Sequence, residues 1–362
     1  MKSSAGEHFL ALDHVRALAA FMVFAWHFLH FNTGFPVPFG YVPSVFPLSL
    51  LAEGHTGVSL FMALSGYLFA KLLDGRRIDY RWFVWNRALR LLPLLAVVIL
   101  IAGIVWYLEG KSLQIYARSI VWGAIYPSWP NGGWSIAVEL HFYLLLPLFL
   151  WLLRRSRWLP LAIVAFALMV RLILHHWNGE VQFLAFFTIV GRVDQFVLGM
   201  VLYHFRSAVA GRHIAAAGGL LGFAVFYWVF DLKGGFYQAP SFPSPSPLWI
   251  VLPTLEGLAY AAGIAWYDNS FRHSGGPVSR FIGRIGVYSY SIYLLHFFVV
   301  FGAARFVHEK VMNISNFYLA CLWALGCFLL MVPLAYLSHR CIEEPCLKLR
   351  RRYVVAGPTL GR

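Results

Sequence analysis

Residues 10–31 read LALDHVRALAAFMVFAWHFLHF, an apolar run broken by only a few polar side chains. A helix needs roughly 20 mostly apolar residues to cross the hydrocarbon of a membrane, and this run is long enough. Runs of similar length recur as far as Leu337, with short polar breaks between them. The sequence therefore predicts an all-α fold, a polytopic bundle of membrane-spanning helices.

The composition of the whole chain agrees with this fold. Of its 362 residues, 60% are hydrophobic and 12% are charged, against roughly 25% charged residues in soluble proteins. We expect no cleavable signal peptide, because His27 and His30 interrupt the first apolar run and no small-residue cleavage site follows it. The four cysteines show neither metal-ligand nor redox spacing. We therefore expect structural cysteines, no metal site and no tightly bound cofactor.

The distribution of basic residues predicts the orientation. With ten spans, alternate connections share one side of the membrane, and cytoplasmic loops are enriched in Lys and Arg. Of the 29 Lys and Arg residues, 21 fall in one set of connections and tails and 5 in the other. This split predicts that both termini are cytoplasmic. The predicted spans are 10–31, 55–73, 91–108, 134–153, 158–175, 181–203, 213–231, 248–267, 286–304 and 316–337.

The two sets of loops differ in chemistry. The net charge of +14 lies in short loops beside apolar spans, which suits topology and contact with the lipid bilayer, and nucleic acid is not an expected partner. The opposite loops, 32–54 and 232–247, are rich in Pro, Phe, Gly and Ser. Their aromatic rings suit an interfacial belt and also sugar stacking. Segment 113–125 is apolar and is either a re-entrant or an interfacial helix.

Charged residues inside spans are the main functional signal, because each costs several kcal/mol in the bilayer centre unless it is paired or functional. Arg16 and His27 are eleven residues apart, which places both on one helix face, roughly 16 Å apart along the axis. Asp13 and His30 fall near the same stripe. An Asp13–Arg16 pair beside a purely structural His27 is the alternative interpretation.

The sixth span contains Arg192 and Asp194 near its middle. Residues two apart on a helix do not face each other, so each needs a partner on another helix or in a wet cavity. Glu139 in the fourth span is the expected partner of Arg192, and it shares a face with Ser135 and Tyr143.

Two later spans add further polar groups. In the ninth span, Ser289, Tyr293 and His296 form a polar face that suits either a site or core packing. Glu256 in the eighth span has no visible partner, and no role is assigned to it.

Six sequence elements, taken in order, resemble the acyltransferase-3 family of bacterial membrane proteins. Each element alone is weak, but together they are specific and cover nearly the whole chain. They are Arg16 with His27 eleven residues later, GVSLFMALSGY at 57–67, Arg87-Ala-Leu-Arg90, Trp134-Ser135-Ile-Ala-Val-Glu139, YSYSIYLLH at 288–296, and Glu343-Glu344-Pro345.

The resemblance implies a multi-pass enzyme of the bacterial inner membrane. It would transfer an acyl group, acetyl by family habit, from acetyl-CoA or another acyl-CoA at the cytoplasmic side. The acceptor would be a hydroxyl of a cell-envelope or exported carbohydrate or glycolipid at the periplasmic side. His27 would be catalytic, and Arg16, Arg87 and Arg90 would bind the donor. Arginine forms bidentate bonds to phosphate, which suits coenzyme A.

The chemistry suggests how these residues would work together. Neutral imidazole accepts protons near neutral pH, so His27 either deprotonates the acceptor hydroxyl or takes the acyl group itself. Glu139 or Asp13 would orient the ring. Since hydrocarbon spans about 30 Å, the substrates need a polar passage, which the stripe from Arg16 to His27 would line. The expected cavity residues are Ser65, Tyr67, Trp134, Ser135, Arg192, Asp194, Tyr293 and His296.

Two other functional classes share some of these features. A transporter or flippase of envelope-glycan precursors also has intramembrane charges, but matched broken helices in two repeated halves are not evident. A scaffold for other envelope-glycan biosynthesis proteins would not need the alignment of Arg16 with His27. Residues 1–340 are expected to form the acyltransferase domain and 341–362 a basic cytoplasmic tail, without the fused hydrolase-like domain of some relatives. Either the acceptor would then reach the membrane bundle itself, or a separate protein would take the acyl group.

Overall fold

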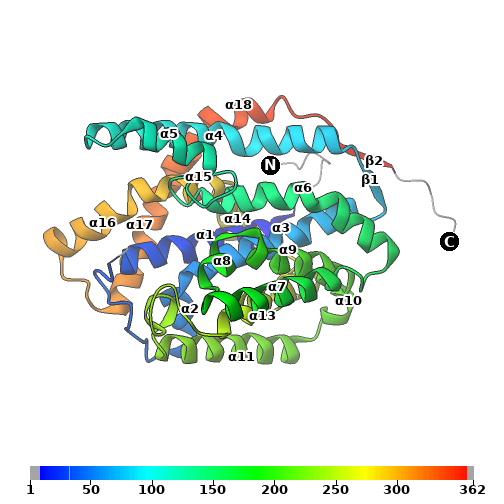
Figure 1. Cartoon of the computed structure of the whole chain (residues 1–362), viewed down its shortest axis with the longest axis horizontal. Coiled ribbons are helices and arrows are strands. Elements are labelled where there is room, and N and C mark those ends of the chain that lie inside the picture. Colours follow the sequence, from blue (N-terminus) through cyan, green and yellow to red (C-terminus); the bar gives the residue numbers. More distant parts are fainter. Residues whose placement is uncertain (1–8, 32, 357–362) are drawn as a thin grey trace.

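The computed structural model describes residues 9–31 and 33–356, and it is a bundle of helices (Figure 1). Within those residues, eight helices are long and apolar enough to cross a membrane, or nine if one bent pair counts as a single span. The predicted all-α membrane fold is therefore confirmed. The eight are α1 (Leu10–His30), α3 (Gly57–Leu73, preceded by the turn η2, Gly54–Thr56), α4 (Tyr80–Leu108), α6 (Trp134–Arg155), α7 (Leu161–Asn178), α11 (His213–Leu232), α13 (Leu248–Ser270) and α17 (Phe317–Ser338), which continues to Leu347.

Two of the ten predicted spans are not continuous helices. Region 181–203 forms α8 (Gln182–Phe187) and α9 (Ile189–His204), which are separated where the backbone of Thr188 is extended. Region 286–304 contains α15 (Ser289–Leu295) and α16 (Val300–Phe306), and the chain bends by 58° between them. By length and composition, the described residues therefore contain eight or nine candidate spans, against the ten predicted.

The third span begins earlier than predicted. Its helix, α4, starts at Tyr80, where the Asp79 side chain accepts a hydrogen bond from the backbone N–H of Trp82 (3.3 Å) and caps the helix. Arg87 and Arg90 consequently lie within α4 rather than before it. Beyond the far end of α4, the segment predicted as re-entrant or interfacial contains α5 (Leu113–Trp122), which has no buried residue.

Short elements occupy the two ends of the bundle. Strand β1 (Arg76–Ile78) pairs antiparallel with β2 (Val354–Ala356), and Figure 1 shows this pair at the same end as α10 (Arg206–Val209). Helices α2 (Ser49–Ala52), α5 and α16 lie at the other end. The remaining short elements are η1 (Phe46–Leu48), α12 (Gly235–Gln238), α14 (Pro277–Val287), η3 (His296–Phe298), η4 (Val307–Val311), η5 (His339–Glu343) and α18 (Glu344–Leu347).

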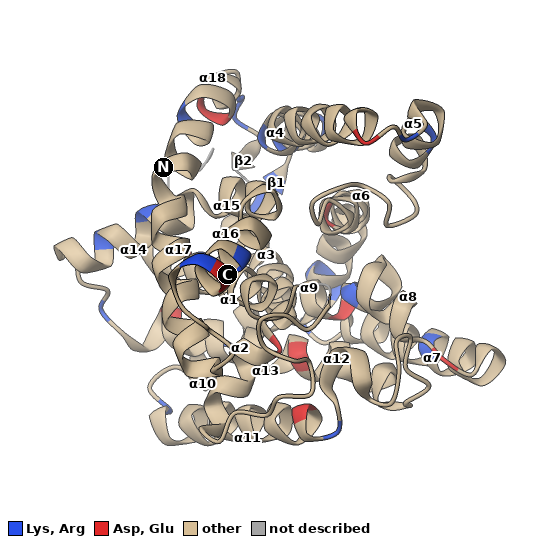
Figure 2. Cartoon of the chain, turned by 90° about the vertical axis from the view of Figure 1, so that its left-hand side faces the viewer, with Lys and Arg blue, Asp and Glu red and all other residues tan. Residues whose placement is uncertain are grey.

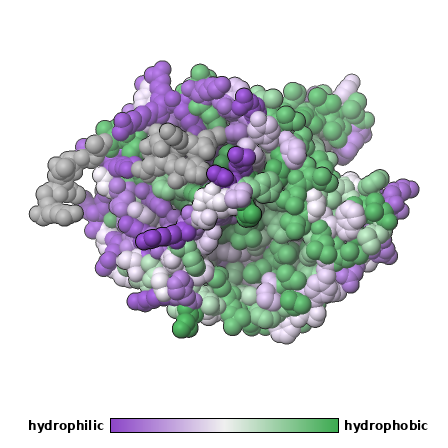
Figure 3. Space-filling view, turned by 180° about the vertical axis from the view of Figure 1, so that it is seen from behind, coloured by the Kyte–Doolittle hydropathy of each residue, from purple (hydrophilic) through white to green (hydrophobic). Residues whose placement is uncertain are grey.

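Polar and apolar residues are separated on the surface between the same two ends of the bundle. Figure 3 shows hydrophilic residues gathered at the end that carries β1 and β2, while hydrophobic residues cover much of the remaining face. A wide apolar surface is expected where lipid surrounds a helix bundle. The charge pattern predicts that the β1–β2 end is cytoplasmic, and that assignment stays a prediction.

Helices α1 and α3 form the centre of the bundle. In their most apolar windows, 72% and 78% of the residues are buried, against 17–22% for α4, α7 and α11. Small residues allow the central helices to approach closely, as is common between membrane helices. A Cβ atom added at Gly66 of α3 would lie 1.9 Å from the Phe196 carbonyl oxygen, and one at Gly199 of α9 would lie 2.1 Å from that of Ala63. This contact fixes α9 against α3.

Gly199→Ala is predicted to destabilise the protein, because the new methyl group overlaps the backbone of α3 and the helices must separate. Overpacking of this kind costs about 1–3 kcal/mol. The matched control is Gly218→Ala in α11, where no atom lies within 4 Å of the added Cβ. Melting temperatures of the purified variants in detergent should fall for Gly199→Ala only. Equal melting temperatures would contradict this packing.

Candidate active site

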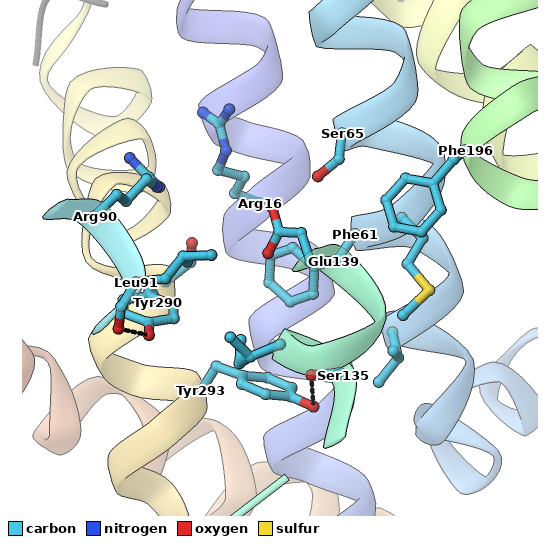
Figure 4. A pocket seen from close by; sticks show the side chains of 14 residues that line it. Arg16, Phe61, Ser65, Arg90, Leu91, Ser135, Glu139, Phe196, Tyr290 and Tyr293 are labelled. Atoms are coloured by element: carbon cyan, nitrogen blue, oxygen red, sulfur yellow. Dashed lines mark hydrogen bonds between the residues drawn. The ribbon is translucent and has the colours of Figure 1, made fainter. Parts of the chain in front are cut away.

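A cavity lies beside α1 in the centre of the bundle (Figure 4). Its free volume is about 90 Å³, which is enough for several water molecules or an acetyl group and too small for a nucleotide. Helices α1, α3, α4, α6, α9 and α15 contribute its walls. The lining residues are Arg16, Val58, Phe61, Met62, Ser65, Arg90, Leu91, Ser135, Ile136, Glu139, Phe196, Ser289, Tyr290 and Tyr293.

The cavity is polar at both ends. Figure 4 shows the side chains of Arg16, Arg90 and Ser65 toward one end, with the Glu139 carboxylate between them and the other end. At that other end, the Ser135 hydroxyl donates a hydrogen bond to the Tyr293 oxygen (2.8 Å). A small polar molecule or an acyl group can therefore find partners along the length of the cavity.

The charged end is held by contacts on α1 and α4. Arg16 forms an ion pair with Asp13, and their side chains are 19% and 7% exposed. The Arg87 guanidinium lies over the rings of Phe69 (5.1 Å) and Tyr143 (5.9 Å), while its Nε atom is buried without a hydrogen-bond partner in the described chain. Three arginines, counting Arg90 of the cavity wall, thus approach from two helices.

His27 is oriented by two neighbours. Its Nδ1 atom lies 2.8 Å from the Val23 carbonyl oxygen, which can only accept, so the hydrogen is on Nδ1 and Nε2 carries the lone pair. His296 Nε2 lies 3.3 Å from the same Nδ1 atom, and its own Nδ1 lies 2.6 Å from the Tyr293 carbonyl oxygen. In a neutral His27 ring held in this way, the Nε2 atom is free of these two contacts and can accept a proton.

His27 and His296 lie near two hollows, the central cavity and a recess on the surface. Tyr293 closes the central cavity, and its ring lies 5.9 Å from that of His296, which is 4.9 Å from the ring of His27. On its other side, His27 contacts Phe297 at 4.5 Å and Phe301 at 6.1 Å between ring centroids. Phe301 also lines a surface recess of about 470 Å³. The recess is formed by Phe31, Thr33, Phe35, Phe301, Arg305 and Glu309.

Asp194 forms an ion pair with Arg171 of α7. Arg171 Nη2 lies 2.7 Å from Asp194 Oδ2, and neither side chain is exposed. Arg171 also donates to the Ile250 carbonyl (2.8 Å) and to the Thr254 hydroxyl (3.0 Å) of α13. The prediction that Asp194 needs a partner on another helix is confirmed. The pair ties α7, α9 and α13 together.

Arg192 pairs with Glu256 (3.5 Å), so the predicted Arg192–Glu139 pair is wrong. Its Nε atom donates to the Phe186 carbonyl (2.7 Å), which the break between α8 and α9 leaves open, and its Nη1 atom bonds to Ser59 (2.6 Å). Figure 2 shows acidic and basic positions inside the bundle near α9 and α13. The Glu256 carboxylate, for which no partner was expected, accepts hydrogen bonds from Thr56, Ser59, Gln195 and Tyr227.

The structure sorts the predicted site residues into two groups. Six of them surround the central cavity: Arg16, Ser65, Arg90, Ser135, Glu139 and Tyr293. The others do not line it. Tyr67 bonds to Asp268 and Asn269, Trp134 packs on Phe186 and Phe187, and Asp13, His27, Arg87, Arg192, Asp194 and His296 have the contacts given above.

The expected orienting group of His27 is replaced by another. Glu139 accepts a hydrogen bond from Tyr143, and Asp13 pairs with Arg16. The groups that bond to the His27 ring are instead the Val23 carbonyl and His296. Helical spacing could not show the contact between His27 and His296, because the two residues lie on distant segments of the chain.

The family model described as "Acyltransferase domain" matches residues 9–340. The chain belongs to this family, the acyltransferase-3 family, and it is a multi-pass membrane acyltransferase.

Several named proteins are similar to the chain, two of them over most of its length. A putative membrane-bound transacylase, BcsY of Komagataeibacter xylinus, is 26% identical over 88% of this chain and 82% of its own length. The acyltransferase MdmB of Streptomyces mycarofaciens is 25% identical over 86% of both chains. The putative peptidoglycan O-acetyltransferase YrhL of Bacillus subtilis is 27% identical over 38% of this chain and 23% of its own. No solved structure matches.

Asp194→Ala is predicted to destabilise the bundle strongly, because it leaves the Arg171 guanidinium buried without its counter-charge. Removing one partner of a buried pair costs about 3–5 kcal/mol. Glu109→Ala is the control, since its pair with Lys111 is half exposed and is worth at most about 1 kcal/mol. Folded yield and melting temperature in detergent should drop only for Asp194→Ala. A normal melting temperature would show that the Arg171 charge is satisfied in another way.

Proposed function

We propose that this protein transfers an acetyl group from acetyl-CoA to a carbohydrate hydroxyl across the inner membrane. The observation that carries the proposal is the path along α1. The central cavity has an arginine-rich end and an end closed by Tyr293, whose ring contacts His296. His296 in turn contacts His27, and Phe301 beside His27 lines the recess. Donor and acceptor would approach His27 from opposite ends of the bundle.

The donor end suits a coenzyme A thioester. Arg16 and Arg90 line the cavity there, and Arg87 lies on the same face of α4. Guanidinium groups form strong charge-assisted bonds to phosphate. Because the cavity has a free volume of only about 90 Å³, it would admit the acyl end of the donor and leave the nucleotide outside. The names of relatives, which include O-acetyltransferases, support acetyl as the transferred group.

The recess near His27 suits a sugar hydroxyl. Phe31, Phe35 and Phe301 provide flat apolar faces, and Arg305 and Glu309 provide a donor and an acceptor at its rim. Binding sites for small molecules commonly combine aromatic walls with a few convergent polar groups. A carbohydrate acceptor would place one hydroxyl toward the His27–His296 pair.

His27 would act as the base in the transfer. Its Nε2 atom takes the proton of the acceptor hydroxyl while the oxygen attacks the thioester carbonyl carbon. The carbon–sulfur bond then breaks, and the coenzyme A thiolate leaves and takes up the proton from the imidazolium. In the alternative route, Nε2 attacks the carbonyl carbon, the carbon–sulfur bond breaks and the coenzyme A thiolate leaves. The acetyl group then passes from Nε2 to the hydroxyl oxygen, and the thiolate takes up the hydroxyl proton. Both routes require the neutral ring that the Val23 hydrogen bond orients.

Broken helices also occur in transporters, where open backbone groups bind ions and substrates. Here two of the carbonyl groups near the breaks already accept hydrogen bonds from side chains. The Phe186 carbonyl accepts from Arg192, and the Tyr293 carbonyl accepts from His296. This arrangement favours the acyltransferase over a flippase of glycan precursors.

His27→Ala is predicted to reduce transfer by about 10²–10⁴-fold, the usual contribution of a general base. Folded yield and acetyl-CoA binding should persist, because alanine removes the base without leaving a buried charge. The assay is release of free coenzyme A thiol from acetyl-CoA by proteoliposomes supplied with envelope glycans, combined with mass spectrometry of those glycans.

The control is His14→Ala on the same helix. His14 bonds to the Tyr267 hydroxyl and the Ser279 carbonyl, both at 2.9 Å, away from the cavity. Its loss should leave transfer within a few fold of wild type once the rate is normalised to folded protein. If His27→Ala turns over at a similar rate, His27 is a structural residue and the proposed chemistry is wrong.

A further inference from the structure

The segment after α18 folds back along α4. Its strand β2 pairs with β1, and the Tyr353 carbonyl accepts a hydrogen bond from the Asp79 N–H (2.8 Å). The Asn86 side chain makes two bonds to the backbone of Arg351, one to its carbonyl (2.6 Å) and one from its N–H (3.0 Å). Residues 348–356 are thereby fixed beside the turn of α4 that carries Arg87 and Arg90.

This segment brings unpaired donors to the arginine-rich end. The Nε and Nη2 atoms of Arg350 are buried and have no hydrogen-bond partner among the described residues, and the same is true of the Tyr353 hydroxyl and of Arg87 Nε. A buried donor without a partner costs roughly 1–3 kcal/mol, and more when the group is charged. Four such atoms at one end of the molecule indicate a missing acceptor.

The charges around Arg350 point to an anion. Burial, together with the nearby positive charges of Arg90 and Arg87, lowers the pKa of Arg350 to about 9. The Glu343 carboxylate has the opposite effect on the pKa of Arg350. However, Glu343 already accepts a hydrogen bond from Ser291 and lies 3.3 Å from His339 Nδ1. Glu343 is therefore shared with other groups and leaves Arg350 incompletely neutralised, whereas a phosphate would fit both the charge and the fork geometry of guanidinium groups.

We propose that Arg350 completes the binding site for the phosphates of coenzyme A, together with Arg87 and Arg90, so that the C-terminal segment forms one wall of the donor site. This inference rests on the proposed function, in which the donor is a coenzyme A thioester. Arg90 belongs to both parts of the donor site. It lines the cavity proposed for the acyl end, and its positive charge is among those that lower the pKa of Arg350. The nucleotide, which the cavity cannot hold, would then lie outside the cavity, beside Arg350.

The test compares Arg350→Gln with Arg352→Gln in the full-length protein. Both variants lose one positive charge from the same segment, but Arg352 is exposed. Isothermal titration of the detergent-solubilised protein with coenzyme A should give a Kd at least about tenfold weaker for Arg350→Gln, a loss typical of one charge-assisted bond. Arg352→Gln should stay within about twofold of wild type. Arg350→Lys, which keeps the charge and loses the fork, should recover part of the affinity.

Each outcome bears on the inference separately from the proposed function. Arg87→Gln serves as the reference, since the proposed donor site requires it to weaken coenzyme A binding. If Arg87→Gln weakens binding and Arg350→Gln does not, the role of the C-terminal segment is overturned while the donor site stands. Equal losses in Arg350→Gln and Arg352→Gln would reduce the effect to general charge and overturn it as well. Absence of coenzyme A binding by the wild-type protein would contradict the proposed function itself.

Discussion

A charge buried among apolar helices must find its counter-charge inside the bundle, and this requirement determines the arrangement of the central helices. Arg171 and Asp194 are fully buried, and Arg192 and Glu256 nearly so, and their two ion pairs connect α7, α9 and α13. Ser59 extends the network to α3, because its hydroxyl accepts a hydrogen bond from Arg192 and donates one to Glu256. With α9 held in this way, Gly199 meets the backbone of α3, and α1 packs beside α3 with the cavity along its polar face.

The sequence predicted where the long helices lie, but it did not predict where two of them are broken. Apolar length alone located the eight long helices of the described residues, because the bilayer requires roughly 20 apolar residues for a span. It did not predict the extended backbone at Thr188, since the surrounding residues remain apolar through the break. What makes the break tolerable is a tertiary contact, the bond from Arg192 to the Phe186 carbonyl. A single-sequence pattern contains no signal for such a contact.

The candidate site was predictable where the residues share a helix, and it was not where partners come from distant segments. Helical spacing correctly placed Asp13 beside Arg16 and showed that Arg192 and Asp194 need separate partners. The choice of Glu139 for Arg192 failed, because periodicity shows which face a residue occupies and not which helix that face meets. The partners of Glu256 emerge only from the assembled fold, because the hydrogen-bond donors Thr56 and Ser59 lie about 200 residues away in the chain. The same is true of the buried Arg350 nitrogens that have no partner among the described residues.

The proposed transfer requires that the donor bind at the arginine-rich end of the bundle and the acceptor at the His27 end. Membrane vesicles of opposite orientation test this directly, since acetyl-CoA is too highly charged to cross the bilayer unaided. Acetyl-CoA added outside should be consumed by inverted vesicles, whose cytoplasmic face is outward, and the acetyl group should appear on glycan enclosed in the lumen. Consumption by right-side-out vesicles, or acetylation on the same side as the donor, would contradict transfer along α1.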